Sequence, residues 1–238
     1  MPLIDQPSLR NRLLRQLGAE DFALLASHLE PVELHKGEVL CEPDEPFTHA
    51  VFPEQAIGSI VAISPDGQMV EAGLFGRDGV SPMGLILGAQ SSPYRLLIQV
   101  PGEAYRLPVA VLREAFDASA SLRDLLLRYV QAQSAQISYT ALSNAVHPVD
   151  ERLARWLLMC HDRSATDEML LTHEFLGIML AVRRPTVTTA LHVLEGNRLI
   201  RAERGRVTIR DRQALEEFAH DAYGRPEAEY ERLLGPLR

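Results

Sequence analysis

The sequence predicts an α+β protein with an N-terminal antiparallel β-roll (jelly roll), a long dimerisation helix and a C-terminal winged helix-turn-helix. Three observations predict this class. Residues 31–108 hold short apolar runs separated by turn residues, a pattern typical of strands. Residues 122–145 repeat apolar residues at helical spacing. Residues 171–211 combine two short helical patterns with two short strand patterns.

Length and composition bound the alternatives. With 238 residues, 46% hydrophobic and 24% charged, the chain has an ordinary globular composition and room for two domains. We expect the β-roll with a helical lead-in over residues 1–120, the long helix and a hinge over 121–147, and the winged helix-turn-helix over 148–238. No apolar run approaches the roughly 18 residues that span a bilayer, and no secretion signal opens the sequence. A cytoplasmic location without a membrane partner is therefore expected.

The β-roll is predicted from the spacing of its strands. Runs of four to seven residues alternate with turns about every ten residues, and residues 65–67 form a hairpin turn. Such a series is typical of a small antiparallel barrel or jelly roll. The two cysteines, Cys41 and Cys160, lie far apart and without metal-ligand spacing, so we expect free thiols and no metal site.

The long helix is predicted to carry two apolar stripes. Residues 119–121 would cap it, and Pro148 would end it, which makes residues 144–148 the expected hinge. The first stripe has an average spacing of 3.5, as in a coiled-coil seam with a second copy, and comprises Leu125, Tyr129, Ala132, Ala135, Tyr139, Leu142 and Val146. The second is expected to pack on the β-roll and comprises Leu122, Leu126, Val130, Ile137 and Ala141. The alternative is one wide buried face inside a monomer.

The C-terminal stretch predicts two helices that cross steeply. The first helix covers residues 172–180 and the second 184–195, with Pro185 in the first turn of the second, where a missing N–H costs nothing. Only residues 181–183 link them, and a link that short is typical of a helix-turn-helix. We expect a left-handed cap at residues 196–197 and a wing hairpin whose turn needs a positive φ at Gly205.

The exposed face of the second helix carries hydrogen-bond donors and lies in a basic region. Residues 172–212 hold eight arginines against four carboxylates, a net charge of +4, whereas the whole chain has −8. Local positive charge with donors on an exposed helix predicts binding to double-stranded DNA through the major groove. The alternative at this point is a polar surface helix without a partner.

Residues 172–195 with the wing, and residues 149–158 before them, resemble the DNA-binding domain of the CRP/FNR family of bacterial transcription regulators. The strands separately resemble the β-roll of cyclic-nucleotide-binding domains, so the resemblance covers nearly all of residues 20–212. It implies a DNA-binding transcription regulator that forms a homodimer through residues 122–146. It also makes RNA polymerase and an unidentified small-molecule effector candidate partners.

The resemblance assigns residues to the DNA interface. In the family an arginine near the start of the recognition helix reads a guanine, and Arg184 matches it. Pro185 stands where an acidic residue often follows, so the family's usual half-site is not assumed. The further DNA-binding candidates are Thr188 and Thr189 for bases, Thr172, Thr186, Arg204 and Arg206 for phosphates, and Arg183 beside them.

The sequence departs from the family where cyclic nucleotides bind. Family members hold the ribose with a Gly-Glu pair and the phosphate with an Arg-Ser/Thr pair, but Ser81 and Pro82, and Ser92 and Pro93, occupy these places. We therefore expect no cyclic nucleotide and identify no cofactor. Arg95, Ser92 and Ser138 are the residues left for a candidate ligand pocket.

Two other function classes are weighed against the regulator. The first is a ligand-sensing or protein-interaction module whose winged helix docks a protein partner instead of DNA; the basic wing and Arg184 favour DNA. The second is an enzyme, for which the sequence offers no nucleophile–base motif, no phosphate-binding loop and no metal-ligand spacing, so no catalytic residue is expected.

Overall fold

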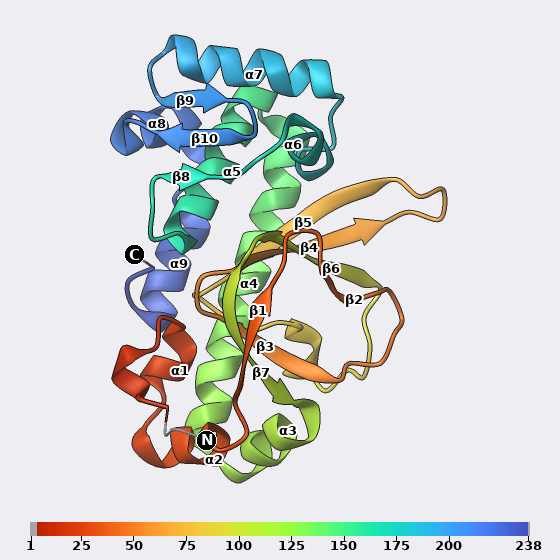
Figure 1. The fold of residues 1–238 in the computed structure, drawn as a ribbon, viewed down its shortest axis with the longest axis vertical. Helices are drawn as coiled ribbons and strands as arrows, with labels where there is room; N and C mark the ends of the chain where they lie inside the picture. Colours follow the sequence, from red (N-terminus) through yellow and green to blue (C-terminus); the bar gives the residue numbers. More distant parts are fainter. Residues whose placement is uncertain (1–3, 238) are drawn as a thin grey trace.

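The computed structural model describes residues 4–237 and has the predicted α+β class, with two antiparallel sheets in its β-roll (Figure 1). One sheet has the strand order β1-β7-β3 and the other β2-β6-β4-β5. The strands are β1 (Glu30–Leu34), β2 (Val39–Cys41), β3 (His49–Pro53), β4 (Ile57–Ile63), β5 (Met69–Phe75), β6 (Tyr94–Val100) and β7 (Gly102–Pro108). The β4–β5 hairpin, with Gly67 at a φ of 79° in its turn, projects sideways from the roll.

The N-terminal lead-in packs against one end of the roll. It consists of η1 (Gln6–Ser8), α1 (Arg12–Gln16) and α2 (Ala19–Ala26); the first three residues of the predicted lead-in lie outside the described chain. Asn11 fixes it, because its side chain caps α1 and also donates hydrogen bonds to the carbonyls of Pro53 and Gly79 at 3.0 and 2.8 Å. This buried amide therefore ties the lead-in to two segments of the roll.

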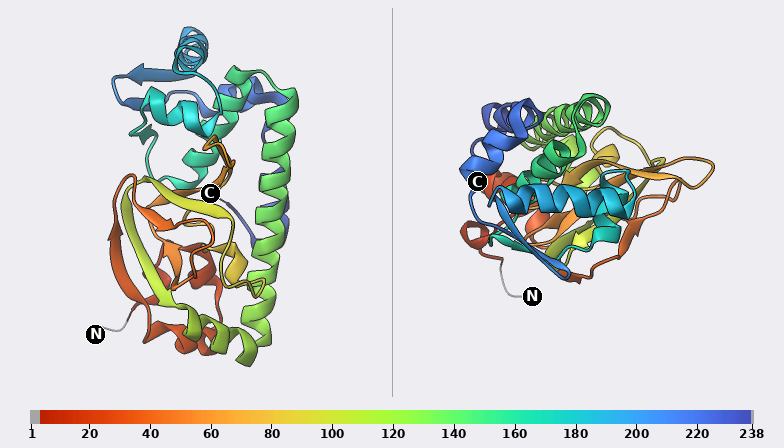
Figure 2. Two further views of the ribbon diagram at one scale, coloured as in Figure 1. Left: turned by 90° about the vertical axis from the view of Figure 1, so that its right-hand side faces the viewer. Right: turned by 90° about the horizontal axis from the view of Figure 1, so that it is seen from above.

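The long helix α4 (Ala120–Val146) follows α3 (Val109–Ala118) and runs along one side of the molecule (Figure 2). It begins as predicted, because the hydroxyl of Ser119 accepts a hydrogen bond from the Leu122 N–H. It ends at His147, and Pro148 precedes the next helix. The turn between the two helices thus falls within the predicted hinge.

The first predicted stripe of α4 is wrong in its N-terminal half. Leu125, Tyr129 and Ala132 are buried in the core of the same chain, so they cannot contact a second copy. Their cover includes the C-terminal helix α9 (Arg225–Leu234), which lies along α4. The outward stripe is offset from the predicted one and contains Leu127, Gln131, Ser134, Ser138, Ala141, Leu142, Ala145 and Val146.

The C-terminal domain, residues 149–219, is built on α5 (Val149–Arg163), whose apolar side is buried as predicted and includes Cys160. It continues through α6 (His173–Met179), α7 (Arg184–Gly196), the wing strands β9 (Ile200–Glu203) and β10 (Arg206–Ile209), and α8 (Arg212–Ala219). A short strand, β8 (Glu168–Met169), pairs with β10 in the order β8-β10-β9. A strand of two residues is too short to leave a periodic signal in the sequence.

The end of α7 differs from the prediction in one residue. Asn197 has a φ of −81°, and the left-handed residue is Arg198, with a φ of 61°. The turn that follows thus places an arginine where glycine or asparagine is preferred. The predicted positive φ of Gly205 in the wing is confirmed at 76°.

The C-terminal domain and the β-roll share a core. Ile57 of β4 and Leu74 of β5 belong to the same apolar cluster as Leu157, Leu176 and Leu191 of the C-terminal domain. After η3 (His220–Ala222), the tail returns to the roll as α9 and closes the other core with Tyr230 and Leu234; η2 (Met83–Leu85) lies in the β5–β6 connection. Within residues 4–237 there is no helix with both the length and the apolar character needed to span a membrane.

Candidate nucleic-acid interface

A helix cap and a close backbone approach shape the junction between α6 and α7. Thr172 caps α6, since its hydroxyl accepts from the Phe175 N–H at 3.2 Å. In the connecting turn Ala181 has a φ of 51°. A Cβ on Gly177 would lie 2.9 Å from the Val182 carbonyl oxygen, so only glycine fits where the turn passes over α6. The crossing helices bury Val187, Leu191 and Leu194 of α7.

The opposite face of α7 is open, and α7 lies across the end of the molecule that is distant from the roll (Figures 1 and 2). Arg183, Arg184 and Thr186 are exposed at its start, and within residues 4–237 neither arginine forms a side-chain hydrogen bond or ion pair. Thr188 and Thr189 donate their hydroxyls to the carbonyls of Arg184 and Pro185, both at 3.2 Å. The two free guanidinium groups therefore remain available for an external anion or base.

The arginines of the wing are not equivalent. Arg206 pairs with Glu168 at 2.7 Å, and Arg201 pairs with Glu203 at 2.7 Å. Arg204, at the exposed tip between β9 and β10, has no side-chain partner in the described chain. The sequence predicted both Arg204 and Arg206 as phosphate ligands. It could not reveal that Arg206 forms an ion pair with Glu168 on β8.

A groove of about 690 Å³ separates α7 from the wing. It brings together Thr172, Arg184 and Arg204, three of the predicted site residues. His173 and His192 also line it, together with Glu174, Glu195 and Glu203. His173 was detectable only from the fold, where its Nδ1 lies 3.0 Å from the Thr188 hydroxyl on the next helix. A base-reading and a phosphate-binding candidate thus face one concave surface.

A buried ion pair attaches the C-terminal domain to the β5–β6 connection. Arg163 at the end of α5 donates two hydrogen bonds to the carboxylate of Asp78, at 2.9 and 2.6 Å, and both side chains are nearly inaccessible. Burial acts to lower the pKa of the Arg163 guanidinium, but the carboxylates of Asp78 and Asp162 outweigh it and raise that pKa. The Asp78 carbonyl also accepts from the Tyr230 hydroxyl of α9 at 2.7 Å.

This connection contains the residues that align with the family's nucleotide-binding pair. Ser81 is buried, and its backbone N–H and carbonyl pair with Val51 of β3 at 3.0 and 2.7 Å. Nearby, Gln133 and Gln136 of α4 bond the carbonyl and N–H of Leu74 on β5, at 3.0 and 2.7 Å. Side chains of the protein itself therefore occupy the junction between the roll and the long helix.

Within residues 4–237, no hydrogen bond or ion pair joins the three candidate ligand residues to one another. Arg95 on β6 pairs with Glu42 at 2.8 Å, and Ser92 lies in the preceding loop. Ser138 lies on α4, where its hydroxyl donates to the Ser134 carbonyl. None of the three lines the cavity of about 410 Å³ that opens between β2 and β3.

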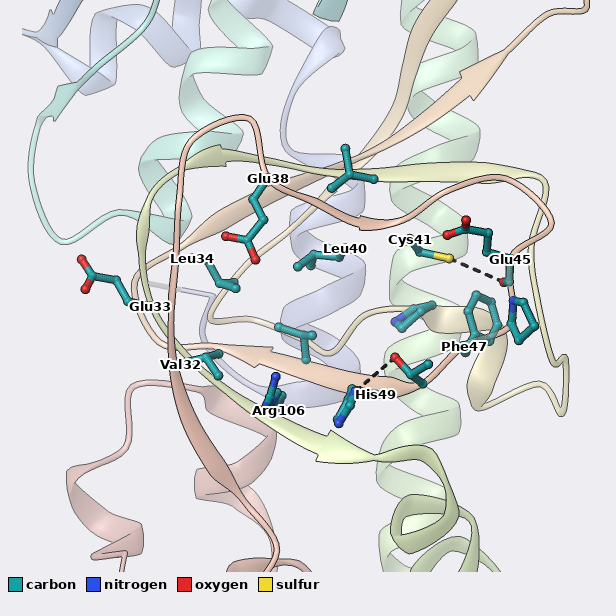
Figure 3. Close-up of a pocket in the computed structure, with 15 residues that line it drawn as sticks. Val32, Glu33, Leu34, Glu38, Leu40, Cys41, Glu45, Phe47, His49 and Arg106 are labelled. Atoms are coloured by element: carbon teal, nitrogen blue, oxygen red, sulfur yellow. Dashed lines mark hydrogen bonds between the residues drawn. The ribbon is translucent and has the colours of Figure 1, made fainter.

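That cavity has apolar walls and acidic groups around it. Leu34, Leu40 and Phe47 border it, and the carboxylate of Glu38 points toward its interior (Figure 3). Glu33 and Glu45 also line it, together with Arg106 and His49. Arg106 is already paired with Glu30 at 2.8 Å. The net character of the lining is therefore acidic.

Cys41 and Cys160 are buried free cysteines, and burial raises the pKa of the Cys160 thiol well above its usual value. In the described part of the chain, residues 4–237, histidine, cysteine and carboxylate side chains form no cluster of three or more that could hold a metal ion.

Comparison with known proteins gives two kinds of match. The family model of the Crp-like helix-turn-helix domain matches residues 151–218. A search of curated proteins gives no match. Among solved structures, a putative transcriptional regulator of the CRP/FNR family from Eubacterium rectale has a TM-score of 0.67 at 17% identity, covering 88% of this chain and 98% of that one.

Two further structures have comparable similarity. FixK2 from Bradyrhizobium japonicum has a TM-score of 0.67 at 17% identity, over 80% of this chain and 96% of its own. A CRP-family transcriptional regulator from Thermus thermophilus has a TM-score of 0.65 at 19% identity, over 79% and 96%. Residues 151–218 thus form a Crp-like helix-turn-helix domain, and the whole chain has the fold of solved transcriptional regulators of the CRP/FNR family.

Proposed function

We propose that this protein is a homodimeric, sequence-specific DNA-binding transcription regulator that acts without a cyclic nucleotide. The observation that carries the proposal is the outward face of α7, where Arg183 and Arg184 are exposed and have no partner within residues 4–237. An unpaired, exposed guanidinium at the start of a helix-turn-helix recognition helix is suited to a base edge or a phosphate.

The residues divide into those that contact bases and those that contact phosphates. Arg184, at the first turn of α7, donates two hydrogen bonds to a guanine in the major groove, and Thr188 and Thr189 retain acceptor oxygens for neighbouring base edges. Arg183, Thr186 and Arg204 contact phosphates, with Thr172 beside them. Arg206 joins them when the DNA phosphate displaces Glu168, its partner at 2.7 Å.

The homodimer forms along the outward stripe of α4. Leu127, Leu142 and Val146 are 42%, 47% and 62% exposed, large fractions for apolar side chains. Between them lie Ser134, Ser138 and Ala141, small residues at spacings of four and three that allow two helices to approach closely. A pair of α4 helices would place two α7 helices in successive major grooves, about 34 Å apart.

The way the roll is filled supports independence from cyclic nucleotides. Asp78 is paired with Arg163, Ser81 with the backbone of Val51, and Gln136 with Leu74, so groups that could face a nucleotide are engaged inside the chain. The cavity between β2 and β3 is bordered by Glu33, Glu38 and Glu45, and such a lining disfavours an anionic ligand. An unidentified effector therefore belongs to a different chemical class, and the cavity of about 410 Å³ has room for it.

The remaining parts of the proposal rest on the similarity to the CRP/FNR family. RNA polymerase is the expected protein partner, and a cytoplasmic location is expected because DNA is the ligand. We assign no catalytic role to any residue. The alternative is that the winged helix docks a protein partner. The acidic residues Glu174, Glu195 and Glu203 in the groove beside α7 favour this alternative, because the surface there is not purely basic.

The test compares two arginine-to-alanine substitutions, each of which removes one positive charge. Arg184→Ala is expected to weaken binding to a selected site by about 1–3 kcal/mol and to relax one base position, because the bidentate contact is lost. Arg15→Ala is the control, since Arg15 is exposed on α1, at the end of the molecule away from α7. Equal effects of the two substitutions, or equal losses on selected and random duplexes, would exclude base reading by Arg184.

A further inference from the structure

A buried carboxyl without a cationic partner joins the β-roll to the helix-turn-helix. Glu71 of β5 is 3% exposed and lies where the sheet meets α5 and α6. Its oxygens are contacted by Ser59 of β4 at 2.5 Å, Gln99 of β6 at 2.5 Å and Trp156 of α5 at 2.9 Å. Within residues 4–237, no lysine or arginine forms an ion pair with Glu71, because Arg163 is paired with Asp78 and Arg155 is bonded to the Gln136 carbonyl.

The hydrogen bonds of Ser59 can also accommodate the neutral acid that burial favours. The Ser59 hydroxyl lies 2.5 Å from Glu71 Oε2 and 3.5 Å from the Sδ atom of Met179 on α6. A hydroxyl has a single proton, so Ser59 cannot donate to both. When Glu71 is protonated, its carboxyl O–H donates a hydrogen bond to Ser59 Oγ, and the Ser59 hydroxyl donates one to the sulfur. Trp156 then donates to the other carboxyl oxygen, and a chain of hydrogen bonds links β5, β4 and α6.

We propose that Glu71 is a proton-operated latch: the neutral carboxyl holds α5 and α6 on the β-roll, and loss of its proton releases them. Docking of the C-terminal domain thus takes up one proton, and release returns it to water. The latch requires no DNA, so its failure and that of the proposed function are separable. In the proposed dimer, release would change the separation of the two α7 helices.

The surroundings of Glu71 determine the direction of its titration. Burial raises the pKa of Glu71 to about 8, while Ser59 and Trp156 by hydrogen bonding, and Arg155 and Arg163 by their charges, lower it. Cys160 on α5 is the other titratable group that interacts with Glu71. Its thiol pKa is itself raised by burial, so Cys160 stays neutral and does not compete.

The sign of the pH effect follows from these values. The docked pKa of about 8 lies above the ordinary value of 4.5, so protonation favours docking. The contribution is complete below about pH 4.5, decreases as the pH rises, and is lost above about pH 8. Between these values the docking equilibrium weakens by up to about tenfold for each pH unit.

The single tryptophan of the chain reports the latch directly. Trp156 donates its indole N–H to Glu71, so its emission, excited selectively, is expected to change with a midpoint near pH 8 in the full-length protein. Glu71→Gln removes the titrating group at nearly constant volume and should abolish the transition. Glu114→Gln, at an exposed position on α3, should leave it intact. A transition that is absent from the unmodified protein, or unchanged in Glu71→Gln, would overturn the latch.

A second variant tests the hydrogen-bond chain. Met179→Leu keeps the volume of the side chain but removes the sulfur acceptor, so the Ser59 proton returns to the carboxylate and stabilises its ionised form. The midpoint should move to lower pH. Should Glu71→Gln fail to fold, the unmodified protein is measured instead, through the infrared carbonyl band of a protonated carboxyl. Loss of this band near pH 8 supports the latch, and its absence at neutral pH contradicts the latch.

Discussion

Single residues at the DNA-facing end differ in whether a carboxylate already holds them. Arg183, Arg184 and Arg204 are unpaired in the described chain, whereas Arg206 is held by Glu168 at 2.7 Å. The sequence predicted which of these side chains are exposed, because exposure follows the helical and strand period. It could not predict the pairing, since residues 168 and 206 meet only when β8 aligns with β10.

Glu168→Gln is therefore expected to strengthen DNA binding. The substitution removes a negative charge and frees Arg206 for a phosphate. Affinity should rise on specific and random duplexes alike, and the slope of log affinity against log salt should steepen by about one. Fluorescence anisotropy over a series of salt concentrations measures both. A gain restricted to the selected site would mean that Arg206 reads a base.

The Asp78–Arg163 pair makes a prediction about stability. Both side chains are almost fully buried, so Asp78→Asn leaves an uncompensated guanidinium charge in the interior. We expect a loss of about 3–5 kcal/mol in the free energy of unfolding, measured by urea denaturation. Glu42→Gln, which breaks the half-exposed pair with Arg95, is the control and should cost less than about 1 kcal/mol. Similar small losses in both variants would contradict the assigned role of Asp78.

At the scale of elements, the ends of helices were more predictable than their faces. Ser119 and Pro148 bracket α4 through local chemistry, a cap and a missing N–H, and the structure has these limits. The buried face of α4 depends on α9, which is about a hundred residues away in sequence. No local period contains that information, so the predicted stripe was offset from the exposed one.

The exposed stripe of α4 makes its own prediction. Ser138→Arg places a long charged side chain in the middle of the stripe, and the proposed dimer should dissociate because two such charges would face each other. Light scattering after size exclusion measures the mass. Asn144→Arg introduces the same charge at an exposed position outside the stripe and should preserve the dimer. Equal masses for the two variants, whether monomer or dimer, would contradict this interface.

Short elements mark the limit of sequence reasoning at this scale. The helix-turn-helix of α6 and α7 was predicted from a three-residue link; the match to the Crp-like helix-turn-helix domain confirms it, and the structure has residues 180–183 between the two helices. The two-residue strand β8 and the left-handed Arg198 were missed. Both are imposed by neighbouring segments: β10 supplies the partner of β8, and the turn into β9 requires the backbone of Arg198.

The whole molecule separates its charge between its ends. Residues 1–146 carry ten basic against seventeen acidic side chains, a net charge of −7, while residues 172–212 carry +4. DNA is thus attracted to the end formed by α7 and the wing and repelled from the roll. The two parts nevertheless share an apolar core and the Glu71 and Asp78 contacts. A change in the roll can therefore alter the position of α7.

The most direct measurement of the central claim is selection of bound sequences from a random duplex pool by the purified protein, with and without cyclic AMP. The account predicts a two-fold-symmetric site whose half-sites lie about one helical turn apart, recovered equally in both conditions. Enrichment only with cyclic AMP would contradict the filled nucleotide site. No enrichment in either condition, from protein shown to be dimeric, would contradict sequence-specific DNA binding.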